Sequence, residues 1–277
     1  MSIWDKLFIL ELFTMRIFAI SDLHTDFEVN YRLLDRLSTS DYKNDVLVVA
    51  GDISHRMNVI KDTLSLLCSI FSKIVYVPGN HELWVRADEV DSIEKLHRVI
   101  ELCEALGVDT KPSRAGDLWI VPLFSWYDTA FDTDGDDDTA ELTGWVDYYL
   151  CKWPMGIDSV SQFFMEMNRP NIKRYDAPVL SLSHFLPRRD LLPSTSQLRF
   201  KGLPKVAGSS VLEEQIRKLQ SSVHVFGHSH IDCDKVIDGI RYVQNALKYP
   251  KERQKEQKTQ ADLSVPLKIV WNSGNHL

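Results

Sequence analysis

The chain has 277 residues, of which 44% are hydrophobic and 26% are charged. This length and composition are those of an ordinary globular protein with one large domain. The formal net charge of −7 opposes long-range attraction to polyanions, so long nucleic acid and anionic lipid surfaces are not expected as partners. A small phosphorylated substrate is compatible with this charge, because bound cations would reverse it locally.

The N-terminal segment and the cysteines bear on where the protein acts. Residues 1–15 are rich in apolar side chains, but they lack the basic region and cleavage site of a signal peptide. We interpret residues 1–15 as an N-terminal extension and residues 16–277 as a single domain. No stretch approaches the ~18 apolar residues of a membrane span. The four cysteines form no CxxC pair, which favours an intracellular and cytoplasmic protein, with import into an organelle left open.

Short apolar runs alternate with segments of helical periodicity along the chain. The runs predict strands at residues 17–20, 46–49, 74–77, 119–123, 179–182 and 223–226. Apolar residues at three- and four-residue spacing predict helices at residues 30–37, 58–71, 89–106 and 208–219. Gly107 is placed to end the third helix. The strand–helix alternation through residue 107 indicates right-handed crossovers and a largely parallel sheet.

The remaining segments carry weaker signals. Residues 142–176 are rich in aromatic side chains and predict irregular structure with short helices over the sheet edge. Residues 235–243 form a hairpin signature, because Asp238-Gly239 suits a type I′ turn, and residues 267–271 predict a final strand. Residues 248–260 are charged and poor in apolar side chains, which predicts a surface loop. The acidic run at 132–138 lacks the glycine and glutamate positions of an EF-hand, so we expect a solvated loop there.

Five short polar motifs follow apolar runs and hold five of the nine histidines. They are Asp22-Leu23-His24, Gly51-Asp52, Gly79-Asn80-His81-Glu82, Ser183-His184 and Gly227-His228-Ser229-His230. Because parallel strands bring their C-terminal loops to one edge of a sheet, we expect these side chains to converge. Asp22 and His24 are two residues apart and would share one face of an extended segment. Imidazole and carboxylate together suit Zn, Mn or Fe, so the motifs predict a metal site, best read as a two-metal site.

In this order, the five motifs resemble those of the calcineurin-like metallophosphoesterase superfamily, and the resemblance runs from about residue 16 to residue 243. It implies an α/β fold, a four-layer α/β/β/α sandwich of two mixed sheets flanked by helices, with a dinuclear metal centre. The first metal would be held by Asp22, His24, Asp52 and His230. The second would be held by Asn80, His184, His228 and the bridging Asp52. Glu82 is expected to position its loop.

The resemblance also implies an activity. The protein would be a dinuclear metal-dependent phosphoesterase, a phosphatase or phosphodiesterase, that hydrolyses a small or exposed phosphomonoester or phosphodiester with a metal-bridging hydroxide. Its two divalent or trivalent ions would be Mn, Zn or Fe. His81 would be the catalytic residue, donating a proton to the leaving group or hydrogen-bonding to the transition state. Six residues near the motifs are expected to contact the substrate: His55, Arg56, Trp84, Arg86, Arg188 and Arg189.

Other functions are compatible with the same motifs. A class III-type cyclic-nucleotide phosphodiesterase shares the motif string, whereas a nuclease is disfavoured by the acidic charge. A non-catalytic scaffold that retains the phosphoesterase fold is the alternative from another class, and the intact ligand set counts against it. His55 stands where the protein Ser/Thr phosphatase branch has an aspartate, which disfavours that branch and leaves no orienting carboxylate for His81. The sequence does not indicate the oligomeric state.

Overall fold

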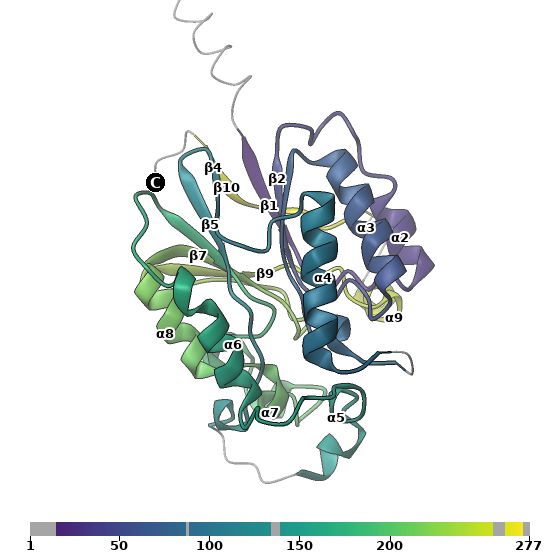
Figure 1. Cartoon of the computed structure of the whole chain (residues 1–277), viewed down its shortest axis with the longest axis vertical. Helices are drawn as coiled ribbons and strands as arrows, with labels where there is room; N and C mark the ends of the chain where they lie inside the picture. The colour runs from purple at the N-terminus through teal and green to yellow at the C-terminus, as the bar shows by residue number, and fades with distance from the viewer. Residues whose placement is uncertain (1–14, 87–88, 134–138, 257–263, 274–277) are drawn as a thin grey trace, which may run out of the picture.

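The computed structural model describes residues 15–86, 89–133, 139–256 and 264–273. Two β-sheets pack face to face in the centre of the protein, and helices cover the outer face of each sheet (Figure 1). This is the four-layer α/β/β/α sandwich that the motifs predicted. The expected N-terminal extension lies, up to residue 14, outside the described residues, as do residues 134–138 of the acidic run.

The first sheet has four strands in the order β10-β1-β2-β3. Their bounds are β1 (Arg16–Ile20), β2 (Val46–Ala50), β3 (Lys73–Val77) and β10 (Lys268–Asn272). Strands β1, β2 and β3 are parallel, while β10 runs antiparallel to β1 at the edge. The helices on this side are α2 (Glu28–Leu34), α3 (Met57–Ile70) and α4 (Ser92–Leu106). As predicted, α4 ends at Gly107, which takes the left-handed conformation with φ +74°.

The second sheet has six strands in the order β4-β5-β6-β7-β9-β8. Their bounds are β4 (Ser113–Ala115), β5 (Leu118–Pro122), β6 (Val179–Leu182), β7 (Ser221–Phe226), β8 (Cys233–Ile237) and β9 (Ile240–Gln244). The four central strands are parallel, and β4 and β8 are antiparallel edge strands. The predicted hairpin joins β8 to β9, with φ +47° at Asp238 and +82° at Gly239, as a type I′ turn requires.

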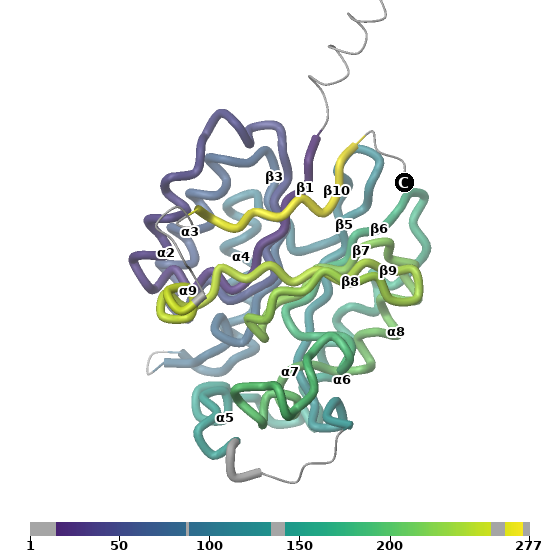
Figure 2. The backbone as a smooth tube through the Cα atoms, turned by 180° about the vertical axis from the view of Figure 1, so that it is seen from behind, coloured from purple at the N-terminus to yellow at the C-terminus, as the bar shows by residue number. Residues whose placement is uncertain are grey.

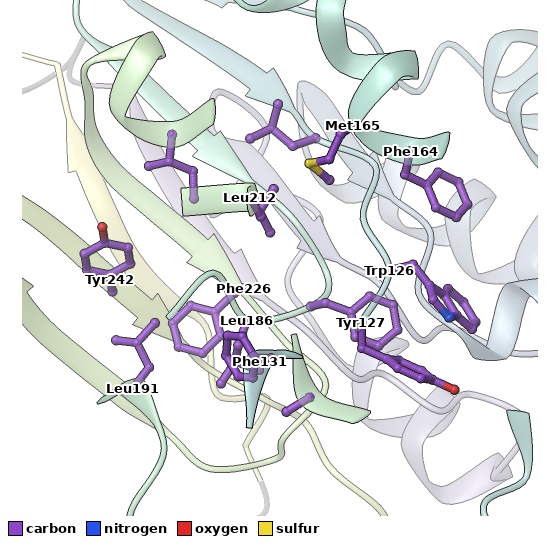
Figure 3. Packing of buried hydrophobic residues seen from close by; sticks show 14 of the residues in the cluster. Trp126, Tyr127, Phe131, Phe164, Met165, Leu186, Leu191, Leu212, Phe226 and Tyr242 are labelled. Atoms are coloured by element: carbon purple, nitrogen blue, oxygen red, sulfur yellow. The ribbon is translucent and has the colours of Figure 1, made fainter. Parts of the chain in front are cut away.

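Alternation along the strands creates separate apolar layers. In β1, Ile17 and Ala19 pack between the two sheets, whereas Phe18 and Ile20 pack against the helices of the first sheet. On the far side, α6 (Val160–Asn168) and α8 (Ser210–Leu219) cover the second sheet. Figure 3 shows residues of this third layer, to which α6, α8 and the strands contribute Phe164, Met165, Leu212, Phe226 and Tyr242.

Irregular segments lie beyond the C-terminal ends of the strands, at the bottom of Figures 1 and 2. They include α5 (Asp147–Leu150) and α7 (Pro204–Ala207). Short 3-10 helices lie in the same region: η1 (His81–Leu83), η2 (Thr129–Phe131), η3 (Thr139–Gly144), η5 (Arg189–Leu191) and η6 (Thr195–Gln197). By contrast, η4 (Arg169–Asn171) follows α6 and precedes β6. Residues 142–176 form irregular structure and short helices as expected, but α6 lies on the face of the second sheet and not over its edge. No helix among the described residues is long and apolar enough to cross a bilayer.

The predicted surface loop at 248–260 is wrong over residues 250–256, which form helix α9 (Pro250–Glu256). Two local features explain why a segment so poor in apolar side chains forms a helix. Pro250 is the first helical residue, where its fixed φ favours the helix and its missing N–H costs nothing. The backbone N–H of Tyr249 donates to Glu252 Oε2 at 3.1 Å, as in one half of a capping box. Residues 257–260 lie outside the described residues.

Candidate metal centre

The seven side chains expected to bind metal lie together, at the C-terminal ends of strands from both sheets. We predicted convergence at the edge of one sheet. In the structure β1, β2 and β3 deliver residues from the first sheet, and β6 and β7 deliver residues from the second. Ligating atoms of six of these residues, together with His81, form three groups, each within 4.8 Å: Asp22, His24 and His230; His24, Asp52 and His81; and Asp52, His184 and His228.

Asp22, His24 and His230 form the first cluster. Nε2 of His24 lies 3.0 Å from Nε2 of His230, which is 3.4 Å from Asp22 Oδ1. The other nitrogen of His230, Nδ1, lies 2.7 Å from Glu252 Oε2, so Nδ1 carries the proton. In the neutral ring, Nε2 therefore presents its lone pair to the cluster. Burial opposes the charge on His230, but Asp22 and Glu252 outweigh it and raise the pKa of His230 to about 9. Without metal the ring is therefore protonated on both nitrogens, and a bound cation would have to displace the proton from Nε2.

Asn80, His184 and His228 form the second cluster, and their hydrogen bonds fix which atoms face it. His184 Nδ1 donates to the Ala50 carbonyl at 2.9 Å, and His228 Nε2 donates to the Val206 carbonyl at 2.9 Å. Lone pairs are therefore left on His184 Nε2 and His228 Nδ1, which lie 3.3 Å apart. Asn80 Oδ1 lies 3.1 Å from the first of these nitrogens and 3.2 Å from the second.

Asp52 lies between the two clusters. Its Oδ1 is 3.4 Å from Nε2 of His184, and its Oδ2 is 3.7 Å from Nε2 of His81. Burial, reinforced by the nearby carboxylate of Glu82, raises the pKa of Asp52 well above its usual range. Bound cations would reverse that effect and stabilise the ionised carboxylate. With two oxygens and neighbours on either side, Asp52 could contact two ions at once.

The chemistry of this donor set fits metal ions. In the second cluster, three lone-pair atoms face one another at 3.1–3.3 Å with no proton among them. Such an arrangement of acceptors is unfavourable unless a cation lies among them. Burial lowers the pKa of His228 and of His24, which keeps both rings neutral and able to ligate. Neutral imidazoles with carboxylate and amide oxygens suit Zn, Mn or Fe.

The backbone is strained where it carries these residues. Positive φ angles occur at Asp22, His24, Asp52, His228 and His230. Each non-glycine residue in this region costs on the order of 1–3 kcal/mol, and such strain is typical of functional sites. The expectation that Asp22 and His24 share a face of an extended segment is therefore wrong, because their φ angles are +53° and +43°. The two side chains converge through left-handed turns instead.

A buried carboxylate holds the loops together. Glu82 accepts hydrogen bonds from the backbone N–H groups of Ile53 at 2.6 Å and Gly79 at 2.6 Å, and it also bonds Asp52 N and Ser54 N. These contacts join the loop after β2 to the loop after β3. A Cβ atom at Gly79 would collide with Asp52 Oδ1, so this position has no room for a side chain. Glu82 therefore positions these two loops, which is the role expected for it from the sequence.

His81 occupies the mouth of the centre, in η1. Its Nε2 lies 3.2 Å from the Tyr249 hydroxyl, and the Trp84 ring packs on it with centroids 3.7 Å apart. Burial, reinforced by the nearby imidazole of His24, lowers the pKa of His81 well below the usual range, so the ring is neutral. Its Nδ1 is buried and has no hydrogen-bond partner among the described residues. Among the described residues, no carboxylate therefore orients His81 through this nitrogen, just as the sequence offered none.

The sequence model of the calcineurin-like phosphoesterase family matches residues 15–232. The chain belongs to this family. It is a metal-dependent hydrolase of phosphate esters, as its motifs predicted. The enzyme assignment removes the support for a non-catalytic scaffold.

This chain is similar to a phosphodiesterase over most of its length. It is 27% identical over 258 residues to the acyl-carrier-protein phosphodiesterase PptH of Mycobacterium tuberculosis, covering 85% of this chain and 78% of that protein. The crystal structure of Phosphopantetheinyl Hydrolase (PptH) superposes with a TM-score of 0.75 and 26% identity, over 93% of this chain and 96% of that one. A symmetrical bis(5′-nucleosyl)-tetraphosphatase of Xylella fastidiosa is 36% identical over 85 residues, only 31% of this chain and 29% of that protein.

A cleft of about 740 Å³ opens beside the metal centre of this phosphoesterase. Asp52, Asn80, His81, His228 and His230 form its floor. One wall is largely apolar and consists of Trp145, Leu198, Phe200 and Leu203. A polar part of the lining comes from the segment around α9, with Lys248, Tyr249, Glu252 and Lys255. The centre can therefore be reached by a molecule with both an apolar and a charged part.

The six residues expected to contact substrate are not among those lining this cleft in the described structure. Trp84 packs behind His81, and Arg86 Nη2 lies 3.3 Å from His55 Nε2. Arg56 is exposed, with a long hydrogen bond to the Asp26 carbonyl. The other two bond to their own surroundings, Arg188 to Asp190 and Glu213 and Arg189 to the Pro193 carbonyl. A role in substrate binding stays a prediction for all six.

Sequence reasoning missed several residues that the structure places at the centre: Trp145, Asp147, Phe200, Tyr249 and Glu252. None of them stands next to a strand-end motif. The one available signal was the Pro250-Lys251-Glu252 sequence, which is typical of a helix start and could have revealed α9.

Proposed function

We propose that this phosphoesterase is a two-metal phosphodiesterase that removes a phosphopantetheine-type group from a carrier protein. The observation that carries the proposal is the pair of lone-pair clusters that meet at Asp52. The similarity to PptH over most of both chains supports the substrate class. The reaction would join water to phosphorus and break the bond between phosphorus and the carrier's serine oxygen, giving a phosphomonoester and a free hydroxyl.

In this proposal, seven residues hold the metals. Asp22, His24 and His230 hold the first ion, Asn80, His184 and His228 hold the second, and Asp52 contacts both. The ions would be Mn, Zn or Fe, which suit this mixture of imidazole, carboxylate and amide ligands. When bound, two such ions polarise phosphoryl oxygens and lower the pKa of water.

His81 would act on the leaving group. It lies within 3.7 Å of Asp52, and burial keeps the free ring neutral. The anionic phosphate of a bound substrate would favour the doubly protonated imidazolium, which can act as an acid. Nε2 faces the cleft side, where it bonds to Tyr249. From there it would donate a proton to the departing serine oxygen, which is a poor leaving group unless protonated. The proton passes from the imidazolium to the serine oxygen as the phosphorus–oxygen bond breaks, which leaves a neutral ring and a free hydroxyl on the carrier.

The cleft supports a substrate with an extended apolar arm. Its volume falls in the range of sites for small ligands and cofactors. The rings of Trp145 and Phe200 are stacked at a centroid distance of 5.7 Å and an interplanar angle of 5°, which gives a flat apolar surface beside His228. A duplex nucleic acid would not benefit from such a wall and is opposed by the net charge of −7. The four free cysteines support an intracellular location as part of this proposal.

The test is a substrate panel with the purified protein and added Mn, Zn or Fe(II). Holo-carrier protein, bis(p-nitrophenyl) phosphate, p-nitrophenyl phosphate and cyclic AMP are offered at equal concentration, with Asp52→Asn as the inactive control. We expect mass spectrometry to show carrier protein that has lost its phosphopantetheine arm, together with free phosphopantetheine. Turnover of cyclic AMP alone would instead favour the cyclic-nucleotide phosphodiesterase, and turnover of monoesters alone would favour a phosphatase.

A further inference from the structure

Asp147 is a buried carboxylate beside the metal centre that contributes no atom to it. It is the first residue of α5 and is only 2% exposed. Its Oδ1 accepts hydrogen bonds from Asn80 Nδ2 at 2.9 Å and from Trp84 Nε1 at 2.6 Å. Its Oδ2 accepts one from Trp145 Nε1 at 3.0 Å. One carboxylate thus joins a proposed metal ligand to two tryptophans.

We propose that Asp147 is the positioning residue that turns the Asn80 amide so that its oxygen, and not its nitrogen, faces the second metal. This inference rests on the proposed metal centre. The two ends of an asparagine amide have nearly the same shape, so packing alone does not select one orientation. The selection has to come from the surroundings of the amide: a hydrogen-bond acceptor beside its NH₂ end, and a donor or a cation beside its carbonyl end.

Asp147 supplies that selection. An indole N–H can only donate, and each carboxylate oxygen receives one, so both oxygens present lone pairs to their neighbours. The NH₂ end of Asn80 is attracted to such an oxygen, whereas its carbonyl end is repelled. In the reversed orientation the NH₂ group would donate to the lone pairs of His184 and His228, which lie 3.1 and 3.2 Å from the amide oxygen. It would then occupy the place where a cation belongs.

The same carboxylate reaches two other parts of the site. The Trp84 ring packs on His81, and the Trp145 ring stacks on Phe200 in the apolar wall of the cleft. Asp147 could therefore act only as an anchor for these two rings. If Asp147 only anchors the two rings, its loss should affect structure and substrate binding. If it orients the Asn80 amide, its loss should selectively weaken the binding of one metal ion.

The decisive experiment is equilibrium metal titration with Mn²⁺ alone. In Asp147→Asn, we expect the second ion to bind about 10–100-fold more weakly, the usual effect of losing a partner of a metal ligand. The first ion should bind as in the wild type. Trp84→Phe and Trp145→Phe are the matched controls, because each removes one donor to Asp147 and leaves the Asn80 contact in place. Both should retain affinity for two ions.

A double-mutant cycle separates action through Asn80 from a general structural role. Asn80→Ala should weaken the second ion by itself, and adding Asp147→Asn should then cause no further loss, because the amide to be oriented is gone. Full additivity of the two losses would overturn the inference. So would an Asp147→Asn variant that binds two ions like the wild type.

One measurement needs no variant and holds even where Asp147→Asn does not fold. In a crystal structure of the wild type with Mn²⁺, Asn80 should place its oxygen on the ion and its nitrogen on Asp147. A reversed amide would contradict the inference. A wild-type protein that binds no metal would instead overturn the proposed function, so the two failures are distinguishable.

Discussion

The hydroxyl of Tyr249 lies 3.2 Å from Nε2 of His81, and its ring stacks on that of His24 with centroids 4.1 Å apart. One residue therefore contacts both the proposed leaving-group acid and a proposed ligand of the first metal. Its neighbour in α9, Glu252, holds the other nitrogen of His230. The match to the family model ends at residue 232, and helix α9 lies beyond it. The residues that contact the first cluster from this helix and its N-terminal flank therefore lie outside the matched region.

Removing this hydroxyl tests whether Tyr249 acts on His81. Tyr249→Phe keeps the ring on His24 and should leave metal content unchanged. A typical hydrogen bond contributes about 1 kcal/mol, so we expect kcat to fall about fivefold through loss of the bond that orients His81. Steady-state kinetics on a diester substrate measures this effect. Tyr249→Ala is the companion variant and should also weaken the first metal; unchanged kinetics in Tyr249→Phe would leave only a packing role for the residue.

The role of His81 predicts a dependence on the leaving group. His81→Ala should keep both metals, because the residue is not a ligand, and should lower turnover by about 10²–10⁴-fold, the usual contribution of general acid catalysis. The loss should be largest for alkyl esters and smaller for p-nitrophenyl esters, whose leaving group departs unprotonated. Rates on matched alkyl and aryl diesters measure the difference. Equal losses on both would favour transition-state stabilisation over proton donation.

The position of Asp52 between the clusters predicts that both ions depend on it. Asp52→Asn should abolish activity and release both metals, because each ion loses the same anionic ligand. Metal analysis by inductively coupled plasma mass spectrometry after dialysis measures this. Asp190→Asn, an exposed aspartate on the surface, is the control and should keep both ions. Two ions retained by Asp52→Asn would show that the bridging assignment is mistaken.

The sequence predicted which side chains converge, because each of them stands only a few residues after the end of a buried strand. An apolar run and the polar residue after it are adjacent in the chain, so the pattern is visible without knowing the fold. The strand pattern alone placed these strand ends at the edge of one sheet, since sheet membership depends on packing. Two sheets were implied only by the resemblance to the family. The strand pattern also gave a wrong reason for the pairing of Asp22 with His24, because left-handed φ angles leave no trace in a pattern of alternating residues.

The supporting residues could not be predicted for a different reason. Asp147 bonds to Asn80 across 67 residues, and Glu252 bonds to His230 across 22 residues. Both sit in charged or aromatic segments without periodicity, where only the approach of distant chain segments defines their roles. Such partners of ligands are set by tertiary structure, so a reading of local motifs finds the ligands and misses what orients them.

His224 provides a prediction about stability, since it lies buried in β7 away from the metals. Ser183 Oγ donates to the Phe185 carbonyl and so accepts from Nε2 of His224 at 3.0 Å. Ser221 Oγ donates to Ser181 Oγ, whose own proton then goes to Nδ1 of His224 at 2.9 Å. The neutral ring is thus fully bonded, and a second proton would face a hydroxyl hydrogen. Burial lowers the pKa of His224 to about 3.

The sign of the pH effect follows from this depressed pKa. The unfolded chain binds a proton at His224 below its ordinary pKa of about 6.5, whereas the folded chain does not until about pH 3. The contribution of His224 to stability is therefore complete above pH 6.5 and is lost as the pH falls towards 3. The loss is about 1.4 kcal/mol per pH unit within this window.

Urea unfolding of metal-free protein at pH 7.5, 6.5, 5.5 and 4.5 measures the effect, with His224→Gln as the non-titrating comparison. Taking the difference between the two proteins cancels the titration of the metal ligands, which both share. We expect the wild type to be more stable at pH 7.5, because glutamine fills the site less well, and the difference to shrink steadily below pH 6.5. A difference in unfolding free energy that stays constant down to pH 4.5 would mean that His224 is protonated in the folded protein, against the hydrogen bonds described above.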